Sequence, residues 1–348
     1  MTDFKLAVVG ATGAVGREVL KILEQRSFPA SSVRAIATAR SAGRRLPFAG
    51  RELEVVAIGD DVFDGVDLVL FDTPDDAAIE WVPKAVAAGA VVVDNSSAMR
   101  LRDDVPLVVP EINPDAARAH KGVVANPNCT AVTLLMPLAP LHRAFGATRV
   151  IASSYQSVSG AGQPGITELY EQTEKLLPER DAVASGEVSG LVPPGPTFAH
   201  PIAFNAIPHV GSFGDGGFTS EERRVLLESR KILSAPSLDV FATCVRIPTI
   251  VAHGIAAWVQ FEREVTLSEV RDVLANADGV ELEDDPGQTR YPTALLASAK
   301  DKGYVGRLRI DPADPRALGF FSTCDNLRKG AALNAVQIAE LLVAMNLL

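Results

Sequence analysis

The cysteine at position 129 stands where a thiol can be reactive. It follows Asn-Pro-Asn in "ANPNCTAV" (125–132) and precedes an apolar run, which predicts that a helix begins beside it. Backbone N–H groups and the helix dipole at such a position favour the thiolate, the nucleophilic form of cysteine. The same N–H groups, with the Asn128 side chain, are suited to hold an oxyanion. We therefore expect Cys129 to be a nucleophile, whereas Cys244 and Cys324 fit the alternative of buried, unreactive thiols.

A thiolate nucleophile also needs a partner for proton transfer. Among the five histidines, His253 in "RIPTIVAHG" has the best setting, although a structural histidine would fit there equally well. Arg246, in "FATCVRIPT", is flanked by apolar residues that do not suit a surface ion pair. An arginine in such a setting is expected to meet a buried anion, such as the carboxylate of a ligand.

A glycine turn follows the first apolar strand. "GATGAVG" (10–16) is a variant of the dinucleotide-binding fingerprint, and it lies between a strand and a helix, as that motif requires. Its glycines let the backbone approach a pyrophosphate at the helix N-terminus; the alternative is a turn that merely needs a positive φ. The residues expected to bind the cofactor here are Gly10, Thr12, Gly13, Ala14, Val15 and Gly16.

The end of the second strand favours NADP over NAD. An NAD enzyme usually carries an acid there for the ribose 2′-hydroxyl. This chain reads "ATARSAGRR" (37–45), in which Arg40 and Ser41 suit a 2′-phosphate; the alternative is a solvated basic turn. The acids of "FDTPDD" (71–76) follow a later strand, where they could begin the next helix, and their charge would need distance from a pyrophosphate.

The pattern of expected strands and helices differs between two parts of the chain. Short apolar strands alternate with helices up to Cys129, which predicts an α/β protein with a Rossmann-type, doubly wound parallel sheet. Longer, more alternating strands follow, which indicates an α+β domain with a mostly antiparallel sheet. The C-terminal segment 326–348 predicts a long amphipathic helix that returns to the first domain. The expected domains are 1–128 with 325–348, for cofactor binding, and 129–324, for catalysis.

Composition excludes several classes of protein. The net charge of −10 argues against a nucleic-acid or anionic-membrane surface, and no apolar stretch reaches the roughly 18 residues that a membrane span needs. Three scattered cysteines make neither a disulfide framework nor a zinc pattern, so no metal site is expected. The chain enters a strand directly after Met1-Thr2-Asp3, so we expect no signal peptide and a cytoplasmic location.

Ordered sequence blocks along the chain resemble the aspartate-semialdehyde dehydrogenases. The blocks are "GATGAVGREVL", "ARSAG", "VVVDNSSAMR", "VPLVVPEIN", "NPNCT", "SYQSVSGAG", "IAFNAIPH", "TCVRIP…AHG" and "DNLRKGAALNAVQIAE". The resemblance implies NADPH-dependent reductive dephosphorylation of L-4-aspartyl phosphate to L-aspartate 4-semialdehyde, through a thioacyl intermediate on cysteine. This reaction belongs to the biosynthesis of lysine, threonine, methionine and isoleucine. A homodimer formed through the second domain is also implied.

The resemblance assigns roles to residues of this chain. Cys129 would accept the acyl group, His253 would be the acid and base, and Gln156 would orient the substrate. The residues implied to bind charged groups of the substrate are Arg100 and Arg224 (phosphate), Arg246 (α-carboxylate) and Glu221 (α-ammonium). The resemblance also implies cofactor contacts from Asn326, which would meet the nicotinamide carboxamide, and from Ser159 and Gly160.

The chain departs from the family pattern in three places. Arg224 stands where the family commonly has lysine, "CTAVT" replaces the more usual continuation after the cysteine, and "FDTPDD" replaces a small loop beside the cofactor. Two other functions remain open. A reductase of N-acetylglutamyl phosphate would leave Glu221 without an ammonium group to meet, and that family tends to carry glycine where Asn128 stands. A non-catalytic NADP-binding paralogue would not need Cys129.

Overall fold

The computed structural model describes residues 4–188 and 190–348. Residues 1–3 and Ser189 lie outside the described residues. The expectation of no signal peptide falls on the first of these, and Ser189 begins the Pro/Gly-rich segment 189–201. The chain forms two compact units. Unit 1 comprises Met1–Ala139, Leu227–Ser237 and Leu327–Leu348, and unit 2 comprises Pro140–Leu226 and Leu238–Asn326.

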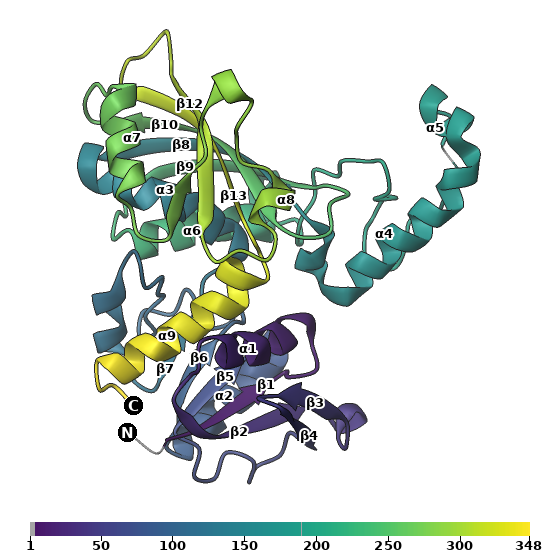
Figure 1. Cartoon of the computed structure of the whole chain (residues 1–348), viewed down its shortest axis with the longest axis vertical. Helices are drawn as coiled ribbons and strands as arrows, with labels where there is room; N and C mark the ends of the chain where they lie inside the picture. The colour runs from purple at the N-terminus through teal and green to yellow at the C-terminus, as the bar shows by residue number, and fades with distance from the viewer. Residues whose placement is uncertain (1–3, 189) are drawn as a thin grey trace. The chain divides into compact units, whose positions relative to one another are not determined.

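Unit 1 is built on a seven-stranded sheet in the order β3-β4-β2-β1-β5-β6-β7 (Figure 1). The pairs are parallel except for β3 with β4, which is antiparallel. The central strands β5 and β6 are buried along their whole length, as expected where helices cover both faces of a parallel sheet. The strands are β1 (Phe4–Val9), β2 (Ala30–Ala37), β3 (Arg45–Phe48), β4 (Arg51–Ala57), β5 (Leu68–Phe71), β6 (Val91–Asp94) and β7 (Val123–Ala125).

Helices α1 (Ala14–Gln25), α2 (Asp75–Ala87) and α9 (Leu333–Ala344) complete this unit. The apolar face of α1 packs into one buried cluster with α9 and the sheet, which includes Val19 and Val336. The long C-terminal helix that we predicted is shorter, because Arg328–Ala332 form wide π-helical turns before α9 begins.

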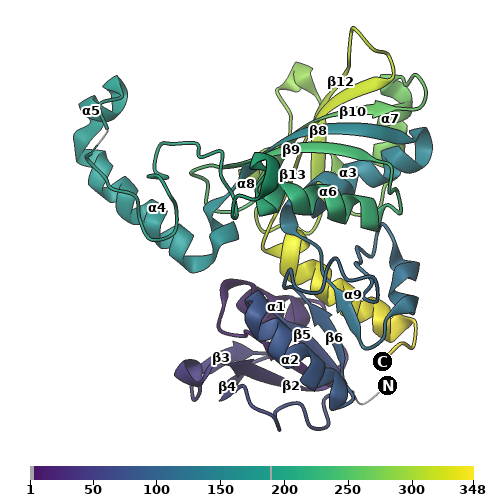
Figure 2. The same cartoon turned by 180° about the vertical axis from the view of Figure 1, so that it is seen from behind.

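Unit 2 contains a six-stranded sheet in the order β11-β12-β13-β10-β8-β9 (Figure 2). Three of its five strand pairs are antiparallel, whereas β11 with β12 and β8 with β9 are parallel. Burial alternates along β9 and β10, so each strand has one covered side and one more open side. The strands are β8 (Ala147–Gln156), β9 (Asp239–Arg246), β10 (His253–Phe261), β11 (Val280–Leu282), β12 (Gly303–Ile310) and β13 (Ala317–Cys324).

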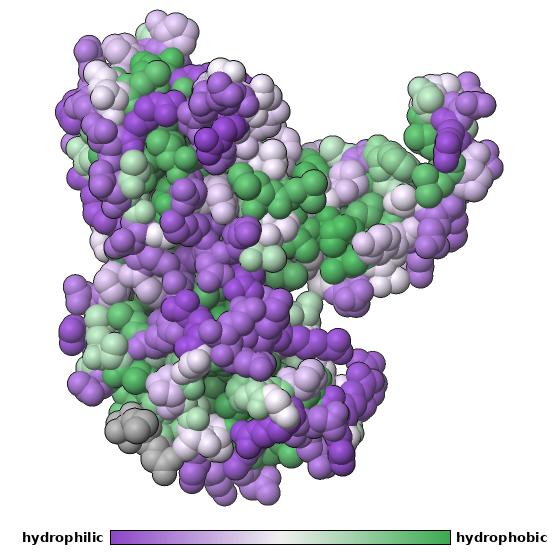
Figure 3. Space-filling view, viewed as in Figure 1, coloured by the Kyte–Doolittle hydropathy of each residue, from purple (hydrophilic) through white to green (hydrophobic). Residues whose placement is uncertain are grey.

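The remaining helices include two that contribute residues to both units, α3 (Cys129–Phe145) and α6 (Ser220–Ile232). The others belong to unit 2 and are α4 (Gly162–Leu176), α5 (Arg180–Ser185), α7 (Leu267–Ala275) and α8 (Ala294–Ala297). Val192 and Phe198, from the Pro/Gly-rich segment, pack with Ile202 and with residues of α4 in one apolar cluster. Hydrophobic residues also gather on the surface of unit 2 around α4 and α8 (Figure 3).

The predicted fold class is confirmed, with a parallel nucleotide-binding type of sheet and a second, mixed sheet. The predicted domain boundaries stay predictions. They differ from the compact units in assigning residues 129–139 and 227–237 to the second domain and residues 325–326 to the first. Among the described residues, no helix is long and apolar enough to cross a membrane.

Candidate active site

The glycine turn between β1 and α1 leaves no room for side chains. Gly10 has a φ of +82°, and a Cβ built on it would lie 1.9 Å from the carbonyl oxygen of Asp72. A Cβ on Gly16 would lie 2.2 Å from the carbonyl oxygen of Gly10. Gly13 is the N-cap residue of α1 and offers no side chain to the helix N-terminus. The turn therefore fits the close approach of a pyrophosphate to these backbone amides.

The end of β2 lies against this turn. Arg40 and Ser41 form a short 3-10 helix, η1 (Ala39–Ser41), and the Thr12 hydroxyl donates to Ser41 Oγ at 3.5 Å. Ser41 is buried and Arg40 is exposed. A hydroxyl and a cation therefore accompany the turn at the place where a 2′-phosphate would require them.

One acid of "FDTPDD" lies closer to the turn than we expected. Oδ2 of Asp72 is 3.8 Å from the position that a Cβ of Gly13 would take, and Asn95 Nδ2 donates to Oδ1 at 3.4 Å. Burial raises the pKa of Asp72 to about 6, against the opposing effect of the bond from Asn95. Asp75 and Asp76 are in the first turn of α2, where negative charge is favourable.

Cys129 is the first residue of α3, as its sequence context predicted. Asn128 Oδ1 accepts hydrogen bonds from the backbone N–H groups of Thr130 (2.9 Å) and Ala131 (3.1 Å), which is the pattern of a helix N-cap. Two of the amides that we expected to hold an oxyanion therefore already have an acceptor, and the role of Asn128 at an oxyanion stays a prediction. The thiols of Cys244 and Cys324 are buried, and burial raises the pKa of Cys244 to about 12.

Arg100, a predicted phosphate ligand, is buried in unit 1 and bonded on several sides. Nε donates to the carbonyl oxygen of Asn126 at 2.8 Å, and an Nη donates to that of Asn95 at 2.6 Å. The other Nη pairs with the carboxylate of Glu228 at 3.3 Å. Glu228 also accepts the backbone N–H of Asn128 at 2.6 Å, and sequence analysis did not single it out.

In unit 2, strand register brings three predicted site residues together. In the pair of β8 with β9, Gln156 lies opposite Arg246. In the pair of β10 with β8, Gly254 lies opposite Tyr155. Extending this antiparallel register by one residue sets His253 beside Gln156. Gln156, Arg246 and His253 are 1%, 6% and 0% exposed, so they share the covered side of the sheet.

A backbone N–H group orients the ring of His253. The Ser157 N–H donates to Nδ1 at 3.1 Å, so the neutral ring carries its proton on Nε2. Burial and the charge of Arg246 lower the pKa of His253 to about 3. Gly160 leaves the space that both side chains use, because a Cβ there would lie 2.7 Å from an Nη of Arg246 and 3.2 Å from Nε2 of His253.

Charged and amide groups from α6 and β8 meet at the same cluster. Gln156 Nε2 donates to a carboxylate oxygen of Glu221 at 3.3 Å, and the other oxygen of Glu221 is 3.6 Å from an Nη of Arg224. Arg246 donates through an Nη to the carbonyl oxygen of Ser157 at 2.7 Å. Unit 2 therefore presents a carboxylate, two cations and an amide within one connected set of contacts.

A network of hydroxyl and amide groups supports the histidine. Asn326 Oδ1 accepts from the backbone N–H of Ala252 (2.9 Å) and from the Ser157 hydroxyl (3.0 Å), and Nδ2 donates to Ser159 Oγ at 3.0 Å. Ala252, directly before His253, has a φ of +71°, which is uncommon for a residue other than glycine. These neighbours engage both the oxygen and the nitrogen of the Asn326 amide, and its predicted contact with a nicotinamide stays a prediction.

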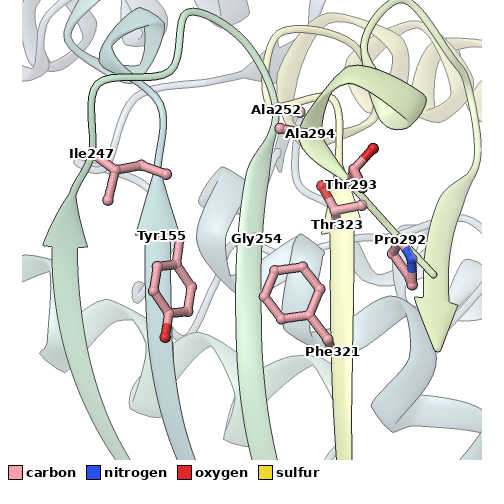
Figure 4. A pocket seen from close by; sticks show the side chains of 9 residues that line it. All are labelled: Tyr155, Ile247, Ala252, Gly254, Pro292, Thr293, Ala294, Phe321 and Thr323. Atoms are coloured by element: carbon pink, nitrogen blue, oxygen red, sulfur yellow. The ribbon is translucent and has the colours of Figure 1, made fainter. Parts of the chain in front are cut away.

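The more open side of the same sheet carries a separate cavity of about 350 Å³ (Figure 4). The rings of Tyr155 and Phe321 lie on either side of Gly254, with their centroids 6.0 Å apart. A Cβ on Gly254 would lie 2.6 Å from the ring of Phe321. Because successive residues of a strand face opposite sides, this cavity and His253 lie on different sides of the sheet. No group of residues able to hold a metal ion occurs among the described residues.

Two family models match the chain. "Semialdehyde dehydrogenase, NAD binding domain" matches residues 5–120, and "Semialdehyde dehydrogenase, dimerisation domain" matches residues 138–329. An aspartate-semialdehyde dehydrogenase of Aquifex aeolicus is 42% identical over 348 residues, covering 99% of each chain. That of Bacillus subtilis is 40% identical over 343 residues, covering 98% of each. The chain belongs to the aspartate-semialdehyde dehydrogenase family.

A solved member of the aspartate-semialdehyde dehydrogenase family has the same fold. It is the aspartate semialdehyde dehydrogenase II from Vibrio cholerae, complexed with ASA, with a TM-score of 0.92, 39% sequence identity and coverage of 99% of each chain. The resemblance stated from sequence is therefore confirmed. The roles of individual residues stay predictions. Sequence analysis missed Glu228 and Ser157, which contact predicted site residues.

Proposed function

We propose that this chain catalyses the NADPH-dependent reductive dephosphorylation of L-4-aspartyl phosphate to L-aspartate 4-semialdehyde. The observation that carries the proposal is identity of about 40% to aspartate-semialdehyde dehydrogenases over nearly the whole chain. The buried set of Gln156, Glu221, Arg246 and His253 in unit 2 supports it, because these groups match a small substrate with opposite charges. A reductase of N-acetylglutamyl phosphate is less favoured, since Glu221 would have no ammonium group to bind.

We assign NADP as the cofactor. The glycine turn fits a pyrophosphate because side chains at Gly10 or Gly16 would collide with backbone atoms. Arg40 offers a charge-assisted hydrogen bond to a 2′-phosphate, and Ser41 offers a hydroxyl. When bound, NADPH supplies the hydride that reduces the acyl group.

The nucleophile of the proposed reaction is Cys129. Its thiolate attacks the acyl carbon of the substrate, a thioester forms, and phosphate leaves with the electron pair of the broken C–O bond. After reduction, collapse of the thiohemiacetal releases the aldehyde and restores the thiolate. The start of α3 at Cys129 supports this role, because a helix N-terminus stabilises negative charge.

His253 is the proposed acid and base, and Gln156 orients the acyl group. The proton on Nε2 of the neutral imidazole suits donation to an oxygen of the reacting carbonyl. Arg246 binds the α-carboxylate and Glu221 the α-ammonium, while Arg100 and Arg224 bind phosphate. Each assignment pairs a charge of the substrate with one of opposite sign.

The proposed assembly is a homodimer formed through unit 2, in the cytoplasm. Ile151, Tyr155 and Phe241, on the open side of the sheet, are 43%, 38% and 51% exposed. Exposed aromatic and aliphatic residues on adjoining strands are typical of a surface that another protein covers. Light scattering after gel filtration tests the dimer, and cell fractionation tests the compartment.

A spectrophotometric assay tests the activity. Aspartate semialdehyde, phosphate and NADP are supplied, and formation of NADPH is followed by its absorbance, with NAD and the semialdehyde of N-acetylglutamate as alternative substrates. Phosphate-dependent reduction of NADP with aspartate semialdehyde supports the proposal. Absence of turnover with that aldehyde, or faster turnover with the acetylated one, would contradict it.

A further inference from the structure

The carboxylate of Glu228 bonds two groups that the proposed reaction uses. Its side chain is fully buried in unit 1, and its two oxygens have different partners. Oε2 accepts the backbone N–H of Asn128 at 2.6 Å, and Oε1 accepts from an Nη of Arg100 at 3.3 Å. Asn128 caps the helix that begins at Cys129. One carboxylate therefore connects the segment of the nucleophile to the phosphate-binding arginine.

These contacts fix the plane of the Arg100 guanidinium. The guanidinium also donates to the carbonyl oxygens of Asn126 and Asn95, which belong to the backbone and cannot rotate away. The negative charge of Glu228 offsets the cost of burying this cation. The guanidinium is thereby held in one orientation before phosphate arrives, and less ordering remains to be done on binding.

The same helix also holds the backbone around Arg100. Lys231, three residues after Glu228, donates through Nζ to the carbonyl oxygens of Arg100 (2.9 Å), Arg102 (2.7 Å) and Val105 (2.8 Å). Residues three apart share a face of a helix, so one face of α6 holds both the side chain and the main chain of Arg100.

We propose that Glu228 is a positioning residue that sets Arg100 and the Asn128–Cys129 segment in register for phosphate departure and return. This inference rests on the proposed function, because it takes Arg100 as a phosphate ligand and Cys129 as the nucleophile. A carboxylate is required, because both partners are donors. A glutamine would offer one acceptor and one donor, so its NH₂ group would face either the Asn128 N–H or the Arg100 guanidinium.

The experiment compares Glu228→Gln with the wild-type enzyme in the aldehyde-oxidising direction. Loss of one charge-assisted bond is expected to raise the KM for phosphate about tenfold or more, while the Kd for NADPH, measured by fluorescence, changes by less than about twofold. Glu228→Asp keeps both acceptors on a shorter side chain and should recover part of the loss. Equal KM values for phosphate in Glu228→Gln and wild type would overturn the inference.

A matched control is available on the same helix. Glu222→Gln removes a carboxylate that accepts the backbone N–H groups of Cys244 (3.0 Å) and Thr219 (2.8 Å) within unit 2 and does not contact Arg100. It should lower the melting temperature and leave the KM for phosphate unchanged. A rise in KM for phosphate equal to that of Glu228→Gln would mean that any loss of stability has this effect, and would overturn the inference.

A double-mutant cycle keeps the test valid if Glu228→Gln folds poorly. Arg100→Ala with Glu228→Gln removes both partners, so no buried charge is left unpaired. If Glu228 acts through Arg100, the double variant should have the KM for phosphate of Arg100→Ala alone. A KM for phosphate in the double variant well above that of Arg100→Ala would overturn the inference. Failure of the proposed function has a different signature, because the wild-type enzyme would then show no phosphate-dependent turnover.

Discussion

The backbone N–H of Ser157 donates a hydrogen bond to Nδ1 of His253 at 3.1 Å. The proton of the neutral ring is therefore on Nε2, which is buried and has no hydrogen-bond partner among the described residues. A buried donor without an acceptor costs free energy, so a functional reason for it is expected. The reacting carbonyl oxygen of the substrate would be a suitable acceptor.

His253→Asn should reduce turnover more than it reduces the burst of acylation, because protons move in the later steps as well. The pKa of His253, lowered to about 3 by burial and Arg246, keeps the free ring neutral throughout pH 6 to 9. The pH profile of kcat/KM for the wild-type enzyme should therefore show no step near pH 6.5 that is due to His253, and His253→Asn should leave the shape of the profile near that pH unchanged. A step of that kind, present in wild type and lost in His253→Asn, would contradict the assignment of a neutral ring.

Cys129→Ser should fold and bind NADPH yet lose nearly all turnover, because a serine hydroxyl is far less acidic than a thiol. Alkylation with iodoacetamide, followed by mass spectrometry, provides a second measurement. Cys129 should react much faster than the buried Cys244, whose pKa is raised to about 12. Retention of more than about a tenth of wild-type activity in Cys129→Ser would remove Cys129 from the role of nucleophile.

Arg40→Asp should erode the preference for NADP over NAD. Arg40 is exposed and lies next to Ser41, which accepts a hydrogen bond from Thr12 of the glycine turn. It offers a charge-assisted bond worth roughly 1.5–3 kcal/mol. The ratio of kcat/KM values for the two cofactors measures the effect. Arg45→Asp, at the start of β3, is the control for a general change of charge; an unchanged ratio in Arg40→Asp would mean that another residue holds the 2′-phosphate.

Asp72→Asn should stabilise the protein at alkaline pH. The pKa of Asp72 is raised from 3.8 to about 6, so the folded state binds a proton more tightly than the unfolded state. Stability is therefore lost as pH rises from about 4 to about 6, and the penalty persists above that range. Urea unfolding at pH 8 should show a gain of about 1–3 kcal/mol that shrinks near pH 4.

The same substitution should also tighten NADPH binding above pH 6, because it removes negative charge beside the glycine turn. Asp76→Asn, exposed in the first turn of α2, is the matched control and should change neither quantity by as much. Weaker NADPH binding by Asp72→Asn would instead indicate that the carboxylate accepts a hydrogen bond from the cofactor.

Local patterns predicted those parts of the site that depend on neighbouring residues. The motif "GATGAVG" located the turn, and the apolar run after Cys129 located the start of α3. Alternation along the strands could also set Gln156 and Ser154 on one side of β8. Contacts between distant segments were not predictable in this way. Glu228 is seven residues after Glu221 on one helix face, but its partner Arg100 is 128 residues away in sequence.

The hydrogen-bond partners of a side chain were harder to predict from sequence than the helix or strand in which the residue lies. The Asn128 side chain was expected at an oxyanion, and its oxygen also caps α3 by accepting from amides of the same helix. Because only the oxygen is used in the cap, the role of the Asn128 amide group at an oxyanion stays a prediction. Asp72 was expected at a distance from the glycine turn. Its backbone instead packs directly on Gly10, and the side chain follows.

Arg224 stands where the family commonly has lysine. One Nη is 3.6 Å from Glu221, and the side chain is 32% exposed, so this i, i+3 pair alone is worth only a few tenths of a kcal/mol. Arg224→Lys should stay within about tenfold of wild-type activity, because the cation is kept. Arg224→Leu should raise the KM for phosphate roughly ten- to a hundredfold and leave that for NADP nearly unchanged.

Arg223→Leu is the matched control for Arg224→Leu. Arg223 is the adjacent residue of α6, and it bonds the carbonyl oxygen of Asp215 at 2.9 Å on the exposed side of the helix. Its loss removes the same charge from the same turn, so any long-range electrostatic effect on phosphate should be similar in the two variants. A phosphate-specific rise in KM confined to Arg224→Leu therefore indicates direct contact. Equal KM values for phosphate in the two variants would mean that Arg224 forms only a surface ion pair. Arg100, which Glu228 holds, would then be the cation that binds phosphate.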